Sequence, residues 1–392
     1  MKILIAHNLY GRLSRGGAET VVADLARGLI ALGHEVAIVS SAPHPAAPST
    51  LKDGSLHYEI RSGYYSLASW PLSRRLIWHL AQFLALGKYR RLRKIAKQYA
   101  PELVITNNLM GLGWLAPLAL AGAAPIVHVL HDIQLVYPSG LLYHGQEKSL
   151  ETFFLRLYRL AVSFLFSPVS GVVSPSRWLL DLHSRYGLLA SRPSAVIPNP
   201  DPLFPAIEKE ARSTGVLRLL FAGQLEEHKG IGFAINALAN AEWQEILEGT
   251  GFSSVELAIA GEGAMAKAIG KERKDSSSFS FRLLGRLDRG SLLSLMQKSD
   301  ILLFPSLCYE NSPMAIKEAL ASGLEVIASR LGGVPELLEE NSLFEPGNKE
   351  KFLACLRKMA TKVSKKAEPE SRPLMGAENY AQKIISFSKT LL

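Results

Sequence analysis

The chain has 392 residues and a formal net charge of +9, and 48% of its residues are hydrophobic. This length exceeds one ordinary hydrophobic core, so we expect more than one domain, and the apolar fraction excludes a largely disordered chain. The only cysteines, Cys308 and Cys355, cannot form a disulfide framework. We therefore expect two buried thiols and a reducing, cytoplasmic environment.

The N-terminal half alternates apolar segments with segments of helical periodicity. Its first apolar block, residues 2–6, is too short for the core of a signal peptide and is interpreted as a strand. Gly11, Gly16 and Gly17 follow this strand and precede a helical pattern. Further strands are predicted at residues 34–40, 102–106, 125–130 and 170–176.

The segment between Ile60 and Pro101 carries nine Lys or Arg residues and no acid, which equals the whole charge excess of the chain. Its aromatic and aliphatic residues allow an amphipathic helix with a basic face. Such a helix can lie on an anionic membrane surface, so residues 61–97 are a candidate membrane contact. An ordinary solvated face packed on the domain remains an equal alternative. Nucleic acid is not expected as a partner, because no nucleic-acid-binding motif accompanies the charge.

Residues 109–127 contain no charged side chain and are long enough to raise the question of a membrane span. Pro117, Pro125 and several glycines interrupt them, and apolar strand-like segments flank them. We therefore predict a loop and a short helix between two buried strands.

The C-terminal half repeats the same alternation after a region rich in Pro and polar residues. Strands are predicted at residues 216–223, 255–261, 281–285, 300–306 and 325–329. The pattern predicts an α/β protein with two doubly wound, Rossmann-like domains. We place the first domain at 1–197, a linker at 198–215 and the second domain at 216–374. A final amphipathic helix at 375–392 is expected to cross back to the first domain.

The stretch YENSPMAIKEALASG, residues 309–323, places two glutamates around the start of a predicted helix. Ser312 is the expected N-cap and Pro313 the first helical residue, with Gly323 at the helix end. Glu310 then precedes the helix and Glu318 lies inside it. Taken alone, the stretch better fits a Glu310 that complements the helix dipole and a solvated Glu318.

Four sets of polar residues follow predicted strands of the two sheets. The glycines at 11, 16 and 17 follow the first strand, and His131 and Asp132 end another. Gln224 and Lys229 follow the strand at 216–223, and Glu310 follows the strand at 300–306. Ligands of doubly wound sheets bind beyond the carboxyl ends of the strands. Because all four sets follow the carboxyl ends of strands, these residues are candidates for binding a ligand.

The sequence resembles the retaining glycosyltransferases of family 4, which have the two-domain GT-B fold. The resemblance spans nearly the whole chain and is strongest at FPSLCYENSPMAIKEALASGLEVIASRLGGVPELL, which matches the paired-glutamate motif of that family. It also rests on the segments GGAETVVADLARGLIALGHEVAIVS, LHDIQLVYPSG, VSPSRWLL, VIPNP, FAGQLEEHKG and AIAGEG.

The resemblance implies a role for each matching residue. Lys229 is expected to meet the donor diphosphate, and Gln224 stands where many family members have Arg. Glu318 is expected to accept hydrogen bonds from the ribose. The transferred sugar is expected to be held by Glu310 and the backbone of Asn311, Ser312 and Met314. Gly16 and Gly17 would close over the donor, His131 would contact the sugar or align the acceptor, and Arg286 would lie near the base or serve only the surface.

The implied reaction moves a sugar from a nucleoside-diphosphate sugar, with UDP favoured over GDP, to a hydroxyl acceptor such as a glycan, lipid or lipid-linked saccharide. No two aspartates lie two positions apart, so a metal-independent reaction without cofactor is expected. In the family, retention is explained by attack on the same face, with a departing phosphate oxygen taking the proton of the acceptor. Two alternatives stay open, namely a GT-B-like sugar-nucleotide epimerase or phosphorolytic enzyme, and a non-catalytic membrane-surface protein that retains the fold.

Overall fold

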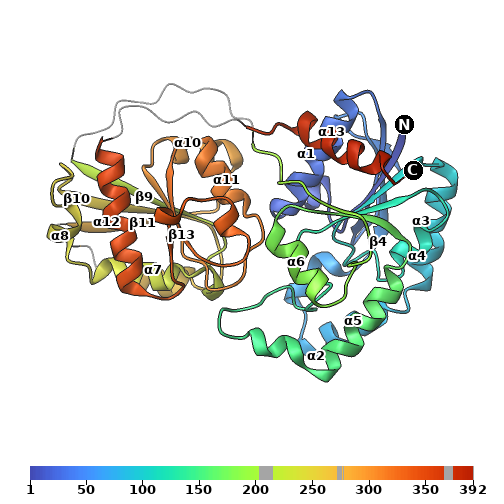
Figure 1. Ribbon diagram of the computed structural model, residues 1–392, viewed down its shortest axis with the longest axis horizontal. Coiled ribbons are helices and arrows are strands. Elements are labelled where there is room, and N and C mark those ends of the chain that lie inside the picture. The colour runs from blue at the N-terminus through green and yellow to red at the C-terminus, as the bar shows by residue number, and fades with distance from the viewer. Residues whose placement is uncertain (203–214, 272–275, 277, 366–373, 392) are drawn as a thin grey trace. The chain divides into compact units, whose positions relative to one another are not determined.

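The protein is described by a computed structural model that covers residues 1–202, 215–271, 276, 278–365 and 374–391, except the side chains at 68, 69, 72, 76 and 80. The chain divides into two compact units (Figure 1). Unit 1 comprises residues 1–140, 148–200 and 375–392. Unit 2 comprises residues 141–147 and 201–374. Most of the expected linker and the polar loop expected at 364–373 lie outside the described residues.

Unit 1 is built on an eight-stranded sheet of order β3-β4-β2-β1-β5-β6-β7-β8. Every pairing is parallel except that of β3 with β4. The strands are β1 (Lys2–Ala6), β2 (Glu35–Ala42), β3 (Ser49–Thr50), β4 (Leu56–Arg61), β5 (Leu103–Thr106), β6 (Ile126–Val129), β7 (Val169–Ser174) and β8 (Ser194–Val196). The helices are α1 (Gly17–Ala31), α2 (Leu72–Gln82), α3 (Leu86–Tyr99), α4 (Ala116–Leu120), α5 (Phe153–Leu165), α6 (Arg177–Arg185) and α13 (Ala377–Lys389), with short 3-10 turns η1 (Gly11–Leu13), η2 (Tyr64–Ser69) and η3 (Glu147–Glu151).

The C-terminal helix α13 packs side by side with α1 (Figure 1). The contact is close because Gly28 of α1 has no side chain. A Cβ atom at this position would lie 2.3 Å from the carbonyl oxygen of Ala377. The buried side chains of Tyr380, Ile384 and Ile385 anchor α13 in unit 1.

Unit 2 is built on a six-stranded sheet of order β11-β10-β9-β12-β13-β14, in which all pairings are parallel. The strands are β9 (Val216–Ala222), β10 (Ser254–Ala260), β11 (Phe279–Gly285), β12 (Ile301–Phe304), β13 (Glu325–Ser329) and β14 (Leu343–Phe344). The helices are α7 (Ile231–Ala239), α8 (Trp243–Leu247), α9 (Ala266–Lys271), α10 (Arg289–Gln297), α11 (Met314–Ala321) and α12 (Lys349–Lys365), with 3-10 turns η4 (Glu227–Lys229), η5 (Val334–Glu336) and η6 (Glu340–Ser342).

The central strands of unit 2 bury both faces. In β9, Leu219 and Phe221 belong to one hydrophobic cluster, which includes residues of α7, α8 and α12. Leu220, between them, belongs to a second cluster that includes residues of α10 and α11. Successive side chains of a strand point to opposite faces, so an unbroken apolar run is what a sheet covered on both sides requires.

The predicted α/β fold with two doubly wound units is confirmed. The structure also confirms a loop and short helix, α4, within residues 109–127, and two buried free thiols at Cys308 and Cys355. The basic segment forms two helices, α2 and α3. Within the described residues, no helix is long and apolar enough to cross a membrane.

Candidate functional site

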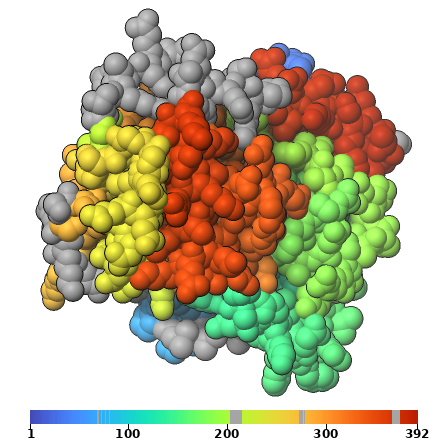
Figure 2. All heavy atoms as spheres, turned by 60° about the vertical axis from the view of Figure 1, so that its left-hand side comes forward, coloured from blue at the N-terminus to red at the C-terminus, as the bar shows by residue number. Residues whose placement is uncertain are grey.

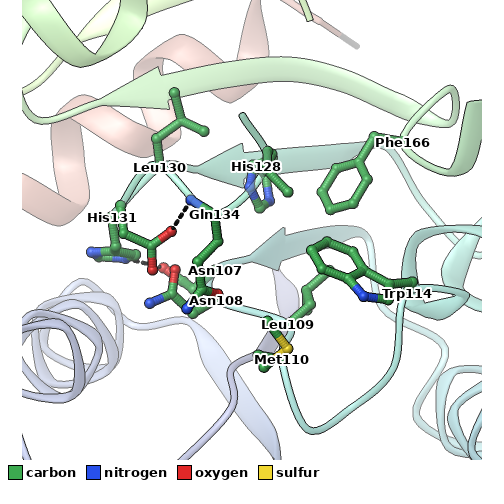
Figure 3. A pocket seen from close by; sticks show the side chains of 12 residues that line it. Asn107, Asn108, Leu109, Met110, Trp114, His128, Leu130, His131, Gln134 and Phe166 are labelled. Carbon is green, nitrogen blue, oxygen red and sulfur yellow. Dashed lines mark hydrogen bonds between the residues drawn. The ribbon is translucent and has the colours of Figure 1, made fainter. Parts of the chain in front are cut away.

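Polar side chains gather at the carboxyl ends of β1, β5 and β6 in unit 1. His131 follows β6, and its Nε2 donates a hydrogen bond to Oδ1 of Asn107, which follows β5, at 2.8 Å. The ring of His7, which follows β1, lies edge-on to the ring of His131 with centroids 6.1 Å apart. Asp132 accepts a hydrogen bond from the backbone N–H of Gln134 at 2.8 Å. Figure 3 shows labelled residues of this cluster around a small cavity of about 20 Å³.

Burial keeps the histidines of this cluster neutral. It lowers the pKa of His131 to about 4. It also lowers the pKa of the fully buried His7 well below its ordinary value, and the neighbouring His131 adds to this effect. The pKa of Asp132 is raised by burial to about 6. A neutral histidine can hydrogen-bond a hydroxyl group without adding a positive charge to the site.

His7 is a feature of this cluster that the sequence interpretation missed. Neither of its ring nitrogens has a hydrogen-bond partner among the described residues, although the side chain is fully buried. Buried polar groups are normally paired, so an unpaired one calls for an explanation such as a functional role. The available signal was a polar residue directly after the first predicted strand.

Unit 2 brings Lys229 and Glu310 together at the carboxyl ends of β9 and β12. The Lys229 ammonium donates to Oε1 of Glu310 at 2.6 Å, and the Ser306 hydroxyl donates to the same oxygen at 3.2 Å. Burial opposes the charge on Lys229, but the Glu310 carboxylate outweighs it, and the pKa of Lys229 is raised. The two side chains form an ion pair and lie within reach of one ligand.

Two glycines let the loops around this ion pair approach each other. Gly230 has a φ of +71°, and a Cβ atom there would lie 1.8 Å from the Pro305 carbonyl oxygen. Gly332 has a φ of +63°, and its Cβ atom would lie 2.0 Å from the carbonyl oxygen of Glu310. The same carbonyl accepts a hydrogen bond from the Gly333 N–H at 2.8 Å. Only glycine fits either position, and the two contacts fix the backbone of Lys229 and Glu310.

Helix α11 begins one residue later than expected, which corrects the prediction that Ser312 is the N-cap and Pro313 the first helical residue. Pro313 is itself the N-cap, with an extended ψ of 122°. Its carbonyl already accepts from the N–H groups of Ile316 and Lys317, as an N-cap carbonyl does. Gly323 follows the helix with a φ of +77°, as expected for a helix stop.

The remaining candidates of unit 2 lie around the same edge of the sheet. Glu318 is a half-buried residue one turn into α11, and Met314 is the first residue of that helix. Asn311 and Ser312 lie between Glu310 and the helix. Gln224 is exposed and follows β9. Arg286 is exposed and follows β11, three strands from β12.

The glycines Gly16 and Gly17 lie in unit 1, between β1 and the first turn of α1. Gly16 is the N-cap of α1, and its N–H donates to Oε2 of Glu19 at 3.0 Å. Gly17 is the first residue of the helix. Both therefore follow β1 at the same edge of the sheet as the His131 cluster.

A short segment between β6 and α5 belongs to unit 2, which the sequence did not suggest. Its backbone pairs with the loop after β12: the His144 N–H donates to the Leu307 carbonyl at 3.0 Å, and the Tyr309 N–H donates to the Leu142 carbonyl at 2.9 Å. The Tyr309 hydroxyl donates to Glu147 at 2.7 Å. These bonds support the loop that carries Glu310.

In the described part of the chain, no group of three or more His, Cys, Asp or Glu side chains has the arrangement of a metal site.

Comparison with known proteins agrees with this geometry. The model of Glycosyltransferase Family 4 matches residues 15–200, and that of Glycosyl transferases group 1 matches residues 217–362. The chain belongs to the family 4 glycosyltransferases. This family 4 glycosyltransferase is 27% identical over 352 residues to an uncharacterized 42.6 kDa protein in the cps region of Klebsiella pneumoniae, covering 86% of this chain and 87% of that protein.

Two further relatives of this family 4 glycosyltransferase have named activities. It is 26% identical over 360 residues to a glycogen synthase of Mycobacterium tuberculosis, covering 86% of this chain and 80% of that protein. It is also 26% identical over 344 residues to a phosphatidyl-myo-inositol mannosyltransferase of Mycolicibacterium smegmatis, covering 83% of this chain and 75% of that protein.

Solved structures show the same fold. Sucrose-phosphate synthase from Thermosynechococcus elongatus matches with a TM-score of 0.68 at 16% identity, covering 100% of this chain and 98% of that one. Anabaena HepE in complex with UDP and glucose matches with a TM-score of 0.63 at 17% identity, covering 100% of both chains. The GT-B fold predicted from the sequence is thereby confirmed.

Proposed function

We propose that this glycosyltransferase moves a sugar, with retention of its anomeric configuration, from a nucleoside-diphosphate sugar to a hydroxyl acceptor. The observation that carries the proposal is the Lys229–Glu310 pair beside the start of α11, with Glu318 one turn into that helix. A cation, a helix N-terminus and two carboxylates suit a ligand that carries both a diphosphate and sugar hydroxyls.

Each group has a defined part in the proposed reaction. Lys229 and the backbone N–H groups at the start of α11 stabilise the negative charge that grows on the leaving diphosphate, with the Gly17 amide as a further donor. Glu310 positions the sugar and stabilises its positive charge, together with the backbone of Asn311, Ser312 and Met314. Glu318 accepts hydrogen bonds from the ribose. Gln224 and Arg286 contact the bound donor, and neutral His131 aligns the acceptor hydroxyl.

We propose UDP as the nucleotide carried by the donor. The complex of Anabaena HepE with UDP and glucose supports this choice. Thermal unfolding with UDP, GDP and ADP tests it, because a ligand that binds only the native state raises the unfolding temperature. We expect the largest rise with UDP and a smaller one in Lys229→Met and Glu318→Gln, while Glu350→Gln in α12 serves as a control for lost charge. Equal shifts with all three nucleotides would refute the assignment to UDP.

We propose that the reaction needs no metal and no cofactor. Excess EDTA is then expected to leave the rate unchanged. A loss of rate that added divalent ions restore would contradict this.

The anomeric configuration of the first-formed product, followed by NMR, tests retention. Release of an isomerised sugar nucleotide without a new glycoside would instead identify an epimerase.

We further propose that the protein works at the cytoplasmic face of a membrane and glycosylates a lipid or lipid-linked acceptor there. The relative named phosphatidyl-myo-inositol mannosyltransferase supports a lipid acceptor. The structure adds an apolar surface on α5. Phe153, Phe154, Leu157, Leu160 and Phe164 are 49–81% exposed. Four of them recur at positions i, i+4, i+7 and i+11, so they form one stripe along the helix.

The opposite side of α5 holds the helix in unit 1. Val162 and Leu165 are buried, and the Tyr158 hydroxyl donates to the Gln134 carbonyl at 2.7 Å. The ring of Tyr158 lies edge-on to Phe83, which follows α2, with centroids 6.4 Å apart. This packed side of α5 therefore lies against the residue that follows α2. In the space-filling view the turquoise and green segment around α5 lies at the molecular surface (Figure 2).

Charge complementarity favours a lipid surface as the partner of this stripe. Helix α5 contains no acid, and its Arg156 is exposed, whereas Arg159 is buried; the segment 61–97 contains basic residues and no acid. Exposed cations next to exposed aromatic and aliphatic side chains match the headgroup and acyl regions of an anionic bilayer. A protein that bound this surface in place of a bilayer would need acidic residues of its own to pair with these cations.

Vesicle flotation tests the membrane proposal. We expect the protein to float with phosphatidylcholine vesicles that contain phosphatidylglycerol and much less with phosphatidylcholine alone. Phe153→Ser/Leu160→Ser should weaken binding by roughly tenfold or more, because each buried side chain contributes about 1.5–3 kcal/mol. Leu374→Ser, which removes another exposed leucine, is the control. Flotation without preference for anionic vesicles contradicts the proposal, and a dimer that only the double variant disrupts would assign the stripe to a second copy.

A further inference from the structure

Unit 1 contains a second cavity, of about 530 Å³, which shares no lining residue with the small cavity beside His131. Three segments line it. They are the loop at 45–47, the end of β4 at Glu59, Ile60 and Arg61, and the first turns of α3 at Gly87, Lys88 and Arg91. Its volume lies within the range of about 300–1,000 Å³ that is typical of ligand pockets.

The cavity has an excess of positive charge. Arg61, Lys88 and Arg91 are its cations, and Glu59 is its acid. The Glu59 carboxylate is already occupied, because Arg12 donates to it at 3.1 Å and the Ala46 N–H donates at 2.7 Å. Among the described residues, no carboxylate pairs with Arg61, Lys88 or Arg91.

Lys88 is held in place by neutral groups. Its ammonium donates to Ser62 Oγ at 3.2 Å, to Gln82 Oε1 at 2.7 Å and to the Gly111 carbonyl at 2.6 Å. Burial lowers the pKa of Lys88 to about 8. A half-buried ammonium without an anionic partner raises the local positive potential, and an anion in the cavity would offset its desolvation.

The cavity lies where a ligand of this sheet is expected. Arg61 is the last residue of β4, so the cavity opens at the carboxyl edge of the sheet. In the sheet order, β4 lies two strands from β1, whose carboxyl end carries His7. Two strand spacings amount to about 10 Å. An extended acceptor with its hydroxyl group in the histidine cluster can therefore reach the cavity with another part.

We propose that this cavity binds a phosphate or diphosphate group of the acceptor. The two arginines present planar guanidinium groups, which bind phosphate oxygens in pairs, and Lys88 supplies a fixed charge behind them. The inference rests on the proposed transferase function, since it assigns one chemical group to the acceptor of that reaction. A neutral glycan acceptor would leave these cations without a counterion.

Inorganic pyrophosphate is the probe for this site. We expect it to bind the full chain in isothermal titration calorimetry, and Arg61→Ala/Arg91→Ala to weaken that binding about tenfold or more, since hydrogen bonds to charged groups contribute about 1.5–3 kcal/mol each. Lys94→Ala/Lys97→Ala is the matched control, because it removes the same number of charges from exposed positions of α3 outside the cavity. The control should keep its affinity within about twofold.

Other variants separate this site from the donor site. Lys229→Met should leave the binding of pyrophosphate to the cavity intact, and Arg61→Ala/Arg91→Ala should leave UDP binding and the unfolding temperature intact. If pyrophosphate binding disappears in Lys229→Met and persists in the arginine variant, the cavity is not an anion site. If Arg61→Ala/Arg91→Ala and Lys94→Ala/Lys97→Ala lose the same amount of pyrophosphate affinity, the loss reflects only net charge, and the proposal is overturned. A wild-type chain that binds pyrophosphate but not UDP would refute the proposed donor and leave the cavity assigned.

Vesicles distinguish an acceptor phosphate from a phospholipid headgroup. If the cavity serves the acceptor, Arg61→Ala/Arg91→Ala floats with phosphatidylglycerol vesicles to the same extent as Lys94→Ala/Lys97→Ala. If the arginine variant alone loses flotation together with pyrophosphate binding, the cavity binds membrane headgroups and the acceptor assignment is wrong.

Discussion

Lys229 and Glu310 are 81 residues apart in the chain, yet their charged groups are 2.6 Å apart in the structure. The pair forms because two neighbouring parallel strands, β9 and β12, end at the same edge of the sheet. Each residue was a candidate from its position after a predicted strand. Their direct contact was not predictable, because it depends on which strands are neighbours.

Replacing Glu310 by Gln tests its role at the level of one residue. The amide keeps the shape of the side chain and removes the charge that would stabilise a positive sugar. We expect kcat to fall by roughly a hundredfold or more, while donor affinity changes much less. Initial rates over a range of donor concentrations, together with calorimetric binding of UDP, provide both quantities.

The exposed Glu350→Gln in α12 is the control for this prediction and should retain wild-type kinetics. Equal losses of turnover and donor affinity in Glu310→Gln would show that Glu310 binds the ground state and does not act mainly in the transition state.

At the scale of elements, the strands with a mostly apolar sequence were predictable, and the half-exposed β4 and the three-residue β8 were not. β12 is wholly apolar, and β9 and β10 are mostly apolar, because both faces of these strands are covered. β4 has the sequence LHYEIR, with polar residues between apolar ones, and β8 has only three residues. Neither shows the pattern of a buried strand, and both are strands because a neighbouring strand completes their hydrogen bonds.

The contact between α1 and α13 gives a prediction about element packing. In Gly28→Ala the new methyl group would clash with the Ala377 carbonyl, so α13 must shift. We expect a loss of about 1–3 kcal/mol in the free energy of unfolding, as in other overpacked sites. Urea unfolding followed by circular dichroism measures this loss, and faster proteolytic removal of residues 375–392 would accompany it.

Gly87→Ala is the matched control, because it lies in a helix where nothing within 4 Å meets a new Cβ atom. Its stability should stay the same or rise by a few tenths of a kcal/mol, as expected from the higher helix propensity of Ala. Equal stability of both variants would mean that the tight packing of α13 contributes nothing to the fold.

At the scale of the whole molecule, buried histidines make stability depend on pH. Burial lowers the pKa of His128 to about 3 and those of His131 and His183 to about 4, against 6.5 in an unfolded chain. As the pH falls below about 6.5, the unfolded chain binds protons that the folded chain does not. The free energy of unfolding should therefore decrease between about pH 6.5 and about pH 4, by up to about 3 kcal/mol for each of these histidines.

Asp132 opposes this trend. Burial raises its pKa from 3.8 to about 6, so the folded chain binds a proton that the unfolded chain releases in the same pH range. Asp132→Asn removes the opposing effect, and the loss of stability on acidification should become steeper than in the wild type. Urea midpoints at about pH 7 and about pH 5 provide the measurement, and a parallel decline in both proteins would contradict the pKa assigned to Asp132.

The sequence by itself determined the α/β class, the repetition of a doubly wound pattern and the residues that follow most of the strands. Periodicity and helix-end signals are local, so one chain contains them in full. Only the tertiary structure decided which candidates meet. It paired Lys229 with Glu310, buried His7 beside His131, placed Arg61 and Arg91 around one cavity and attached residues 141–147 to unit 2. These contacts join segments that are distant in the chain, and strand order, which sets them, is a property of the folded sheet.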